Sequence, residues 1–259
     1  MLETKKQMNQ HYFSAWLLCC LLLSGCASTE QKNEQYSIDN NASLAQAAFD
    51  YAQYDKATVL YRTLIKSAPK RPEFQVMLAR SLYQQDKKKA AQKILHSLLA
   101  QGESTDAALY LGKYLLRDSR VKEATTVYQQ GLNIASSQII AADKLAALHN
   151  GLGVAWLSED QFEKGKMAFV EAMLLNPDDP SYRSNLALCW LLSGDTKQAR
   201  DVFTPLLSYQ KLPAQVEMNF ALLLLAEGKE QQARKVLSRY LSSSQIDQDI
   251  NQLKAGLVQ

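Results

Sequence analysis

A small side chain followed four positions later by Tyr, Leu or Phe recurs along this chain at nearly constant intervals. From one copy to the next, the small residue advances by 34, 33, 41, 34 and 34 positions. Such a period restricts the fold to a stack of similar units, because each unit buries its apolar face only against its neighbours. The six pairs are Ala57/Tyr61, Ala91/Leu95, Ala124/Tyr128, Gly165/Phe169, Ala199/Phe203 and Ala233/Leu237.

A second set of small residues lies twelve positions before the first. Two antiparallel helices approach closely only where side chains are small, so both sets are expected at helix crossings. The low numbers of glycine and proline, 10 and 6, together with abundant Leu, Ala, Gln and Lys, favour helix throughout. The second set is Ala45, Ala79, Gly112, Gly153, Ala187 and Ala221.

This pattern resembles the tetratricopeptide repeat (TPR). We predict an all-α, right-handed superhelical solenoid of about six helix pairs, rather than a helical bundle with accidental periodicity. Ile246, Ile250, Leu253 and Leu257 form one apolar stripe, which predicts a helix that caps the last repeat. The predicted repeats cover about 38–71, 72–104, 105–145, 146–179, 180–213 and 214–245, and the cap covers 246–259.

The 41-residue step marks an irregularity near the middle of the chain. It places extra residues around Ser136 to Lys144, where we expect longer helices or an extended turn. Asp179-Pro180 is typical of a helix start, since Asp caps free N–H groups and proline is tolerated in the first turn.

The N-terminus has the organisation of a secretory signal. Lys5 and Lys6 precede the apolar run 12–23. This run is shorter than the ~20 residues that a transmembrane helix needs. The sequence Leu23-Ser24-Gly25-Cys26 resembles the bacterial lipobox, which implies cleavage between Gly25 and Cys26 and acylation of Cys26. The alternative is a plain signal with a chance cysteine. We predict a signal peptide over 1–25 and a lipidated, flexible tether over 26–37.

Acyl chains on Cys26 would anchor the protein, because each buried methylene contributes ~0.8 kcal/mol. The residue after Cys26 is Ala27 rather than Asp. By resemblance to lipoprotein sorting in enteric bacteria, this implies the outer membrane, with the protein facing the periplasm.

The first helices of the repeats should line a groove that binds partner proteins. This groove is predicted to be basic near the tether and apolar toward the C-terminus. Asn185 and Asn219 occupy equivalent positions, where an amide either pairs with a bound peptide or ties one helix to the next. The predicted groove residues are Arg80, Tyr83, Lys113, Arg117, Leu157, Asn185, Leu188, Leu191, Leu192, Met218, Asn219, Leu222 and Leu225.

No motif indicates chemistry. His96 and His149 have no cysteine or carboxylate at ligand spacing, and the sequence has no HExxH, paired CxxC or phosphate loop. We therefore expect no catalytic residues, no metal, no cofactor and no small-molecule substrate. The net charge of +3 does not suggest nucleic-acid binding. Cys189 is expected to be a buried apolar residue.

Several strings in the second half resemble the TadD lipoproteins of the tight adherence (Tad, or Flp pilus) system. That resemblance implies a pilotin-like or scaffolding role in pilus assembly, with the secretin or other Tad components as partners. The alternatives are a scaffold of another type IV pilus, secretion or envelope-assembly system, and an accessory that activates a cell-wall enzyme. The strings are Leu148-His-Asn-Gly-Leu-Gly-Val-Ala-Trp156, Leu175-Asn-Pro-Asp-Asp-Pro180, Ser184-Asn-Leu-Ala-Leu188, Leu192-Ser-Gly-Asp195 and Asn219-Phe-Ala-Leu222.

Overall fold

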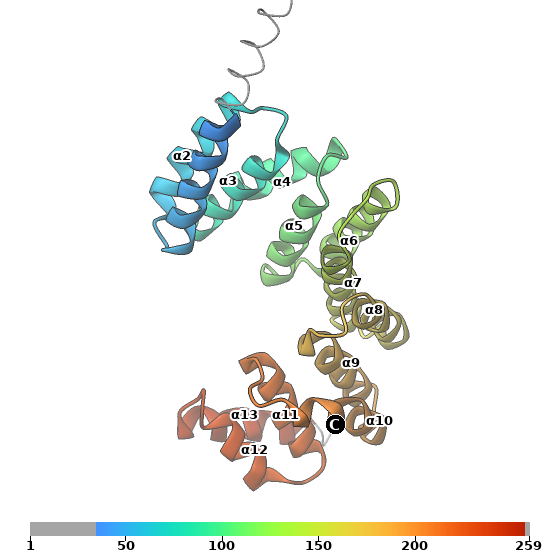
Figure 1. The fold of residues 1–259 in the computed structure, drawn as a ribbon. Helices are drawn as coiled ribbons and strands as arrows, with labels where there is room; N and C mark the ends of the chain where they lie inside the picture. The colour runs from blue at the N-terminus through green and yellow to red at the C-terminus, as the bar shows by residue number, and fades with distance from the viewer. Residues whose placement is uncertain (1–34, 257–259) are drawn as a thin grey trace, which may run out of the picture. The chain divides into compact units, whose positions relative to one another are not determined.

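The protein is described by a computed structural model over residues 35–256, with side chains up to Asn251 (Figure 1). These residues form α-helices and one short 3-10 helix, and none of them lies in a β-strand. Residues 35–50 are helical and precede the labelled helices. The others are α2 (Tyr54–Ser67), α3 (Pro72–Gln84), α4 (Lys88–Ala100), α5 (Thr105–Arg117), α6 (Val121–Ser136), α7 (Ala142–Leu157), α8 (Phe162–Leu175), α9 (Pro180–Leu192), α10 (Thr196–Phe203), η1 (Thr204–Ser208), α11 (Ala214–Ala226), α12 (Glu230–Leu237) and α13 (Ser243–Gly256).

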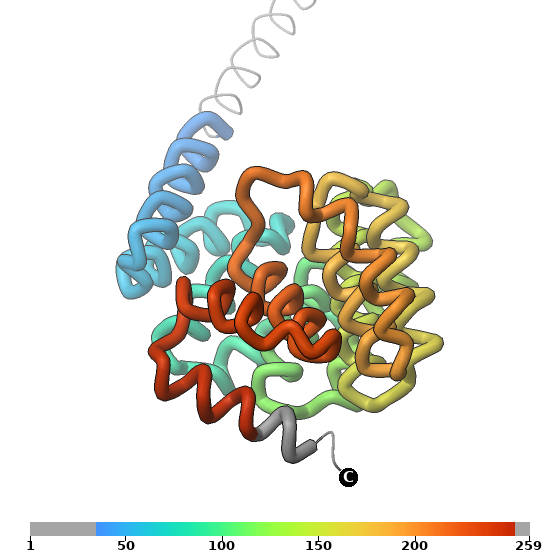
Figure 2. Tube along the Cα trace, turned by 90° about the horizontal axis from the view of Figure 1, so that it is seen from below, coloured from blue at the N-terminus to red at the C-terminus, as the bar shows by residue number. Residues whose placement is uncertain are grey.

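The helices form consecutive antiparallel pairs, which confirms the predicted repeat. The chain divides into two compact units, Met1–Ile94 and Leu95–Gln259, with the boundary inside α4. In the second unit the pairs α7–α8 and α9–α10 pack side by side, yellow to orange in Figure 2. Each first helix there also contacts the next one, so that α5, α7, α9 and α11 form a continuous row. We call the surface of this row the first-helix side.

The small residues that define the period are all buried. The first set, from Ala57 to Ala233, consists of five alanines with 0% exposure and the buried Gly165. The second set, from Ala45 to Ala221, is buried as well. The bulky partner residues fill the adjacent space, since Tyr61, Phe169 and Phe203 are among the largest fully buried side chains. Burial of both sets agrees with their predicted place at the helix crossings.

The two helices of each pair are joined by the same turn, repeated six times. One residue of each turn has a positive φ, between +55° and +92°, and lies five positions before the small residue of the second helix. The following N–H donates to the carbonyl five positions earlier at 2.8–3.0 Å, as in a Schellman motif. The positive-φ residues are Ala52, Asp86, Ser119, Asp160, Gly194 and Gly228.

Because an L-residue at positive φ is strained by roughly 1–2 kcal/mol, glycine should be better at these turns. We expect Ala52→Gly to raise the free energy of unfolding by about 0.5–1 kcal/mol, after the greater entropy of glycine in the unfolded chain is deducted. Urea denaturation followed by circular dichroism measures this change.

Gly194→Ala is the matched reverse substitution. A Cβ at Gly194 would have nothing within 4 Å, so only its φ of +92° opposes the alanine. We expect Gly194→Ala to destabilise by about 1 kcal/mol. If both substitutions changed stability in the same direction, backbone strain would not explain these turns.

The extra residues of the 41-residue step between Ala124 and Gly165 are divided between two helices and the segment that connects them. Helices α6 and α7 have 16 residues each, against 13 in α3, α4 and α5, and residues 137–141 join them. Helix α7 therefore begins at Ala142, before the predicted repeat start at 146. Two contacts fasten this region to the preceding repeat: Lys144 Nζ lies 2.7 Å from Asp106 Oδ2, and Gln138 Nε2 donates to the Gly102 carbonyl at 3.4 Å.

Both ends of the repeat array extend further than predicted. Residues 35–37, which the prediction assigns to the tether, are helical, and the Gln35 amide donates to the Asp39 carboxylate one turn later. Helix α13 begins at Ser243 rather than 246, because Ser242 and Gln245 form a reciprocal capping box. Ile246 and Ile250 of this helix are buried against α11 and α12. The signal 1–25, the predicted tether up to residue 34, and the side chains of Leu253 and Leu257 lie outside the described residues.

Candidate protein-binding surface

The predicted groove residues all lie on first helices of repeats, but in both units. Arg80 and Tyr83 belong to α3 of the first unit, and the other residues belong to α5, α7, α9 and α11 of the second. Those of the second unit lie on helices that contact one another in sequence, from α5 through α7 and α9 to α11.

The exposure of these residues differs widely. Leu192 is 54% exposed, and Lys113 and Arg117 are exposed as well. Tyr83 and Asn219 are buried, at 6% and 4% exposure, and so present little surface to a ligand. Arg80, Asn185, Leu188 and Leu222 are half-buried. Leu157, Leu191, Met218 and Leu225 are also half-buried and pack against core clusters. The use of these residues by a partner remains a prediction.

Three asparagines form a hydrogen-bonded row across the first helices. Asn219 of α11 donates to Ser184 Oγ at 2.9 Å and to Asn185 Oδ1 at 3.5 Å. Asn185 of α9 donates in turn to Asn150 Oδ1 of α7 at 2.8 Å. We call Asn150, Asn185 and Asn219 the asparagine row. Its bonds join three consecutive repeats, so the amides tie one helix to the next.

Asn150 was missed by sequence reasoning. It precedes Asn185 by 35 positions, whereas Asn185 and Asn219 are 34 apart, so Asn150 falls outside the register of the repeat. A primary amide has two N–H donors. Among the described residues, the amide nitrogen of Asn150 donates no hydrogen bond. Asn150 is half-buried and therefore offers these donors at the edge of the row.

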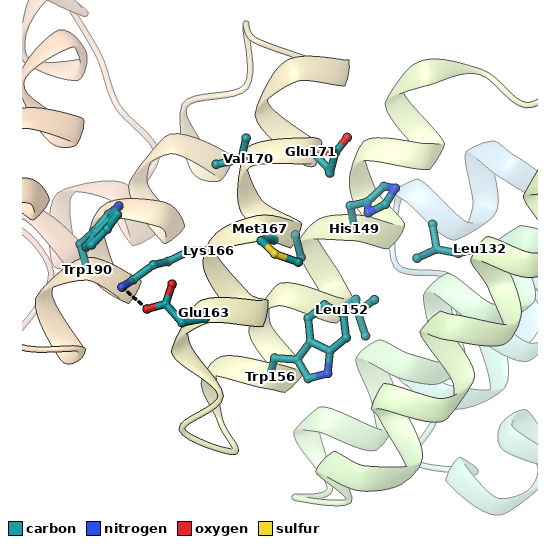
Figure 3. Close-up of a pocket in the computed structure, with 11 residues that line it drawn as sticks. Leu132, His149, Leu152, Trp156, Glu163, Lys166, Met167, Val170, Glu171 and Trp190 are labelled. Atoms are coloured by element: carbon teal, nitrogen blue, oxygen red, sulfur yellow. Dashed lines mark hydrogen bonds and ion pairs between the residues drawn. The ribbon is translucent and has the colours of Figure 1, made fainter.

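A separate cleft of about 510 Å³ lies mainly between α7 and α8 (Figure 3). Its lining includes Trp156, His149 and the 65% exposed Met167. Lys166 is nearly buried at its edge, with Nζ 2.9 Å from Glu163 Oε1 and 3.6 Å from the centre of the Trp190 ring. This lysine is already neutralised, so it does not supply a free cation for a ligand.

Burial shifts the pKa values of two ionisable groups near this cleft. Burial raises the pKa of the Cys189 thiol to about 11, so the reactive thiolate is scarce at neutral pH. Burial also lowers the pKa of His149, partly offset by Glu171. Within residues 35–251, no three His, Cys, Asp or Glu side chains are grouped as metal ligands. Within the described part of the chain, no helix has the length and apolar character needed to span a bilayer.

Comparison with known proteins identifies the fold. The family model described as "Anaphase-promoting complex, cyclosome, subunit 3" matches residues 50–131, less than half of the chain. No curated protein sequence matches.

Several solved structures resemble most of this chain. PilF of Pseudomonas aeruginosa has 16% identity and a TM-score of 0.65, covering 85% of this chain and 98% of its own. PilW, described as a widely conserved type IV pilus biogenesis factor, has 17% identity and a TM-score of 0.62, covering 78% and 91%. A thermophilic TPR protein from Thermus thermophilus has 20% identity and a TM-score of 0.56, covering 73% and 99%. With these likenesses, the paired helices and the repeated turns, the chain is a protein of the tetratricopeptide-repeat type.

Proposed function

We propose that this chain is a lipid-anchored, non-enzymatic scaffold that binds partner proteins during assembly of a type IV-related pilus of the Tad (Flp) class. The acyl chains on Cys26 would hold it on the periplasmic side of the outer membrane. The observation that carries the proposal is Leu192, which is 54% exposed at the end of α9. Leu188 lies one turn earlier on the same side of the helix and is half-buried.

The surroundings of these leucines suit a peptide segment rather than a small molecule. The asparagine row joins the same first helices, and Asn150 at its end offers N–H donors that a main-chain carbonyl can accept. An exposed leucine on α9, with amide donors on the neighbouring helix α7, can bind an apolar side chain and a peptide group of the same segment. The likeness to PilW, a type IV pilus biogenesis factor, supports a pilus partner, and the secretin of the same system is our candidate.

Leu192→Asp tests the proposal. Burying a leucine contributes about 1.5–3 kcal/mol, so placing a carboxylate at this contact should weaken secretin binding at least about tenfold. The measurement is the dissociation constant of the purified lipoprotein for the secretin subunit. Because Leu192 is more than half exposed in the free protein, we expect the helical circular dichroism to be unchanged.

Leu174→Asp is the matched control. Leu174 is 67% exposed on α8, the second helix of the preceding pair, and is thus at least as accessible as Leu192. We expect Leu174→Asp to bind the secretin normally. Loss of binding in Leu174→Asp, with retention in Leu192→Asp, would move the binding surface to the second helices.

A further inference from the structure

Charge is distributed unevenly between the two units. Residues 35–94 carry ten Lys and Arg against five Asp and Glu, a net charge of +5. Residues 95–259 carry 16 against 18, a net charge of −2. The described part of the first unit is therefore strongly basic, although the whole chain is close to neutral.

Most of the acidic residues among residues 35–94 form ion pairs within that segment. Arg71 binds two of them, with Nη1 2.9 Å from Asp39 Oδ1 and Nε 2.5 Å from Glu73 Oε1. Asp86 lies 4.0 Å from Lys88 Nζ. Because ten cations face only five acidic residues in this segment, an excess of positive charge remains whatever the pairing.

Part of that charge lies on the second helices of the first two repeats. Arg62 and Lys66 are one turn apart on α2, as are Lys89 and Lys93 on α4, so each pair shares one side of its helix. All four are exposed, and none has an ion pair or side-chain hydrogen bond within the described residues. We call these four residues the basic face.

Two contacts place the start of α4 next to α2. Gln85, three residues before α4, donates from Nε2 to Thr58 Oγ1 at 2.7 Å and to the Tyr54 carbonyl at 2.9 Å. The residues of α4 include no Asp or Glu, and those of α2 include only Asp55. The basic face therefore has little acidic charge on its own helices to oppose a polyanionic partner.

The position of the anchor points to the membrane as that partner. Nine residues lead from Cys26 to Gln35, where the described helix begins. At most ~3.6 Å per residue, this length cannot exceed about 32 Å. Helix α2, with 14 residues, is itself about 21 Å long. A chain acylated at Cys26 thus keeps its first unit close to the headgroups.

We propose that the basic face docks on anionic phospholipid headgroups of the leaflet that holds the acyl chains. This inference rests on the lipid anchor of the proposed function. Each Lys or Arg close to an anionic leaflet strengthens binding to the membrane by roughly fivefold. Four of them therefore add to the binding by the acyl chains, which by themselves fix no orientation of the protein. Docking gives the first unit a preferred side toward the membrane.

Lysine footprinting of the full lipidated protein in vesicles tests the docking. An uncharged amine-reactive reagent is applied at low salt to protein in phosphatidylcholine vesicles, with or without one third phosphatidylglycerol, and modification is read by mass spectrometry. We expect Lys66, Lys89 and Lys93 to react at least about fivefold more slowly on the anionic vesicles. High salt should restore their reactivity, because it screens the attraction.

Lys211 and Lys235 are the internal controls, since both are exposed in the second unit. Their rates should be equal in the two kinds of vesicle. In the variant Arg62→Glu with Lys66→Glu, Lys89 and Lys93 should react equally fast in both.

Equal rates for Lys66, Lys89 and Lys93 in neutral and anionic vesicles would overturn the docking, and the face would then suit an acidic protein instead. The docking would also be overturned if these three lysines reacted more slowly than Lys211 and Lys235 to the same extent in both kinds of vesicle, because headgroup charge would then not be the cause. Failure of the anchor is a different result: the Cys26 peptide would carry no acyl mass and the protein would not remain with the vesicles.

Discussion

Gly151→Ala is expected to lower the free energy of unfolding by about 2 kcal/mol, as the net of overpacking and a gain in helix propensity. A Cβ on Gly151 would lie 2.4 Å from the Tyr128 ring atoms Cε1 and Cζ, far inside contact distance. The ring cannot easily move away, because its tip also contacts Gly112 of α5, where a Cβ would lie 2.5 Å from Cζ. Urea denaturation followed by circular dichroism measures the loss.

Gly165→Ala provides the control for this prediction. Its Cβ would lie 3.2 Å from Cys189 Sγ, a tight but tolerable contact, so we expect a change within about 1 kcal/mol. Adding Tyr128→Leu to Gly151→Ala should cost less than the sum of the two single losses, because the smaller side chain relieves the overlap. Equal stabilities of Gly151→Ala and Gly165→Ala would show that the Tyr128 ring is not confined between α5 and α7.

Cys26→Ser should remove the protein from the outer membrane. The hydroxyl cannot take the thioether-linked diacylglycerol that the lipobox implies, and the hydrophobic contribution of ~0.8 kcal/mol per methylene is lost with the acyl chains. Density-gradient separation of inner and outer membranes measures the change, and mass spectrometry of the N-terminal peptide shows whether acyl groups are present.

Cys189→Ser is the matched control, because Cys189 is buried on α9 and has no part in anchoring. We expect it to be lipidated and sorted as in the native protein. Unchanged outer-membrane content of Cys26→Ser would contradict the anchor. The protein-binding surface of the second unit would still be testable by the leucine variants.

The regular parts of the fold could be predicted because each is encoded by a spacing. The distance between the small residues sets the length of each helix pair, and the structure places a left-handed turn five residues before Ala57 and each of its equivalents. The position of Asp179-Pro180 also gave a helix start, and the Asp179 side chain accepts the N–H of Ser181 at 2.9 Å. These features depend on local geometry alone.

Other features could not be read from the same spacing. Asn150 lies one position out of register, so its bond to Asn185 depends on how α7 and α9 pack. The burial of Tyr83 likewise follows from packing, which the repeat pattern does not resolve. Arg200 pairs with Glu227 from the neighbouring repeat, and this guanidinium holds the pKa of Glu227 below its usual range. Such contacts join residues that no motif relates.

The hydrogen bonds of the asparagine row all run one way. Gln215 donates to Asn219, Asn219 donates to Asn185, and Asn185 donates to Asn150. The side-chain oxygen of Asn219 is therefore occupied at the α11 end, while the amide donors of Asn150 are left unused at the α7 end. A polypeptide lying across these helices would meet a surface with polarity, so its N-to-C direction and its reverse would not bind equally well.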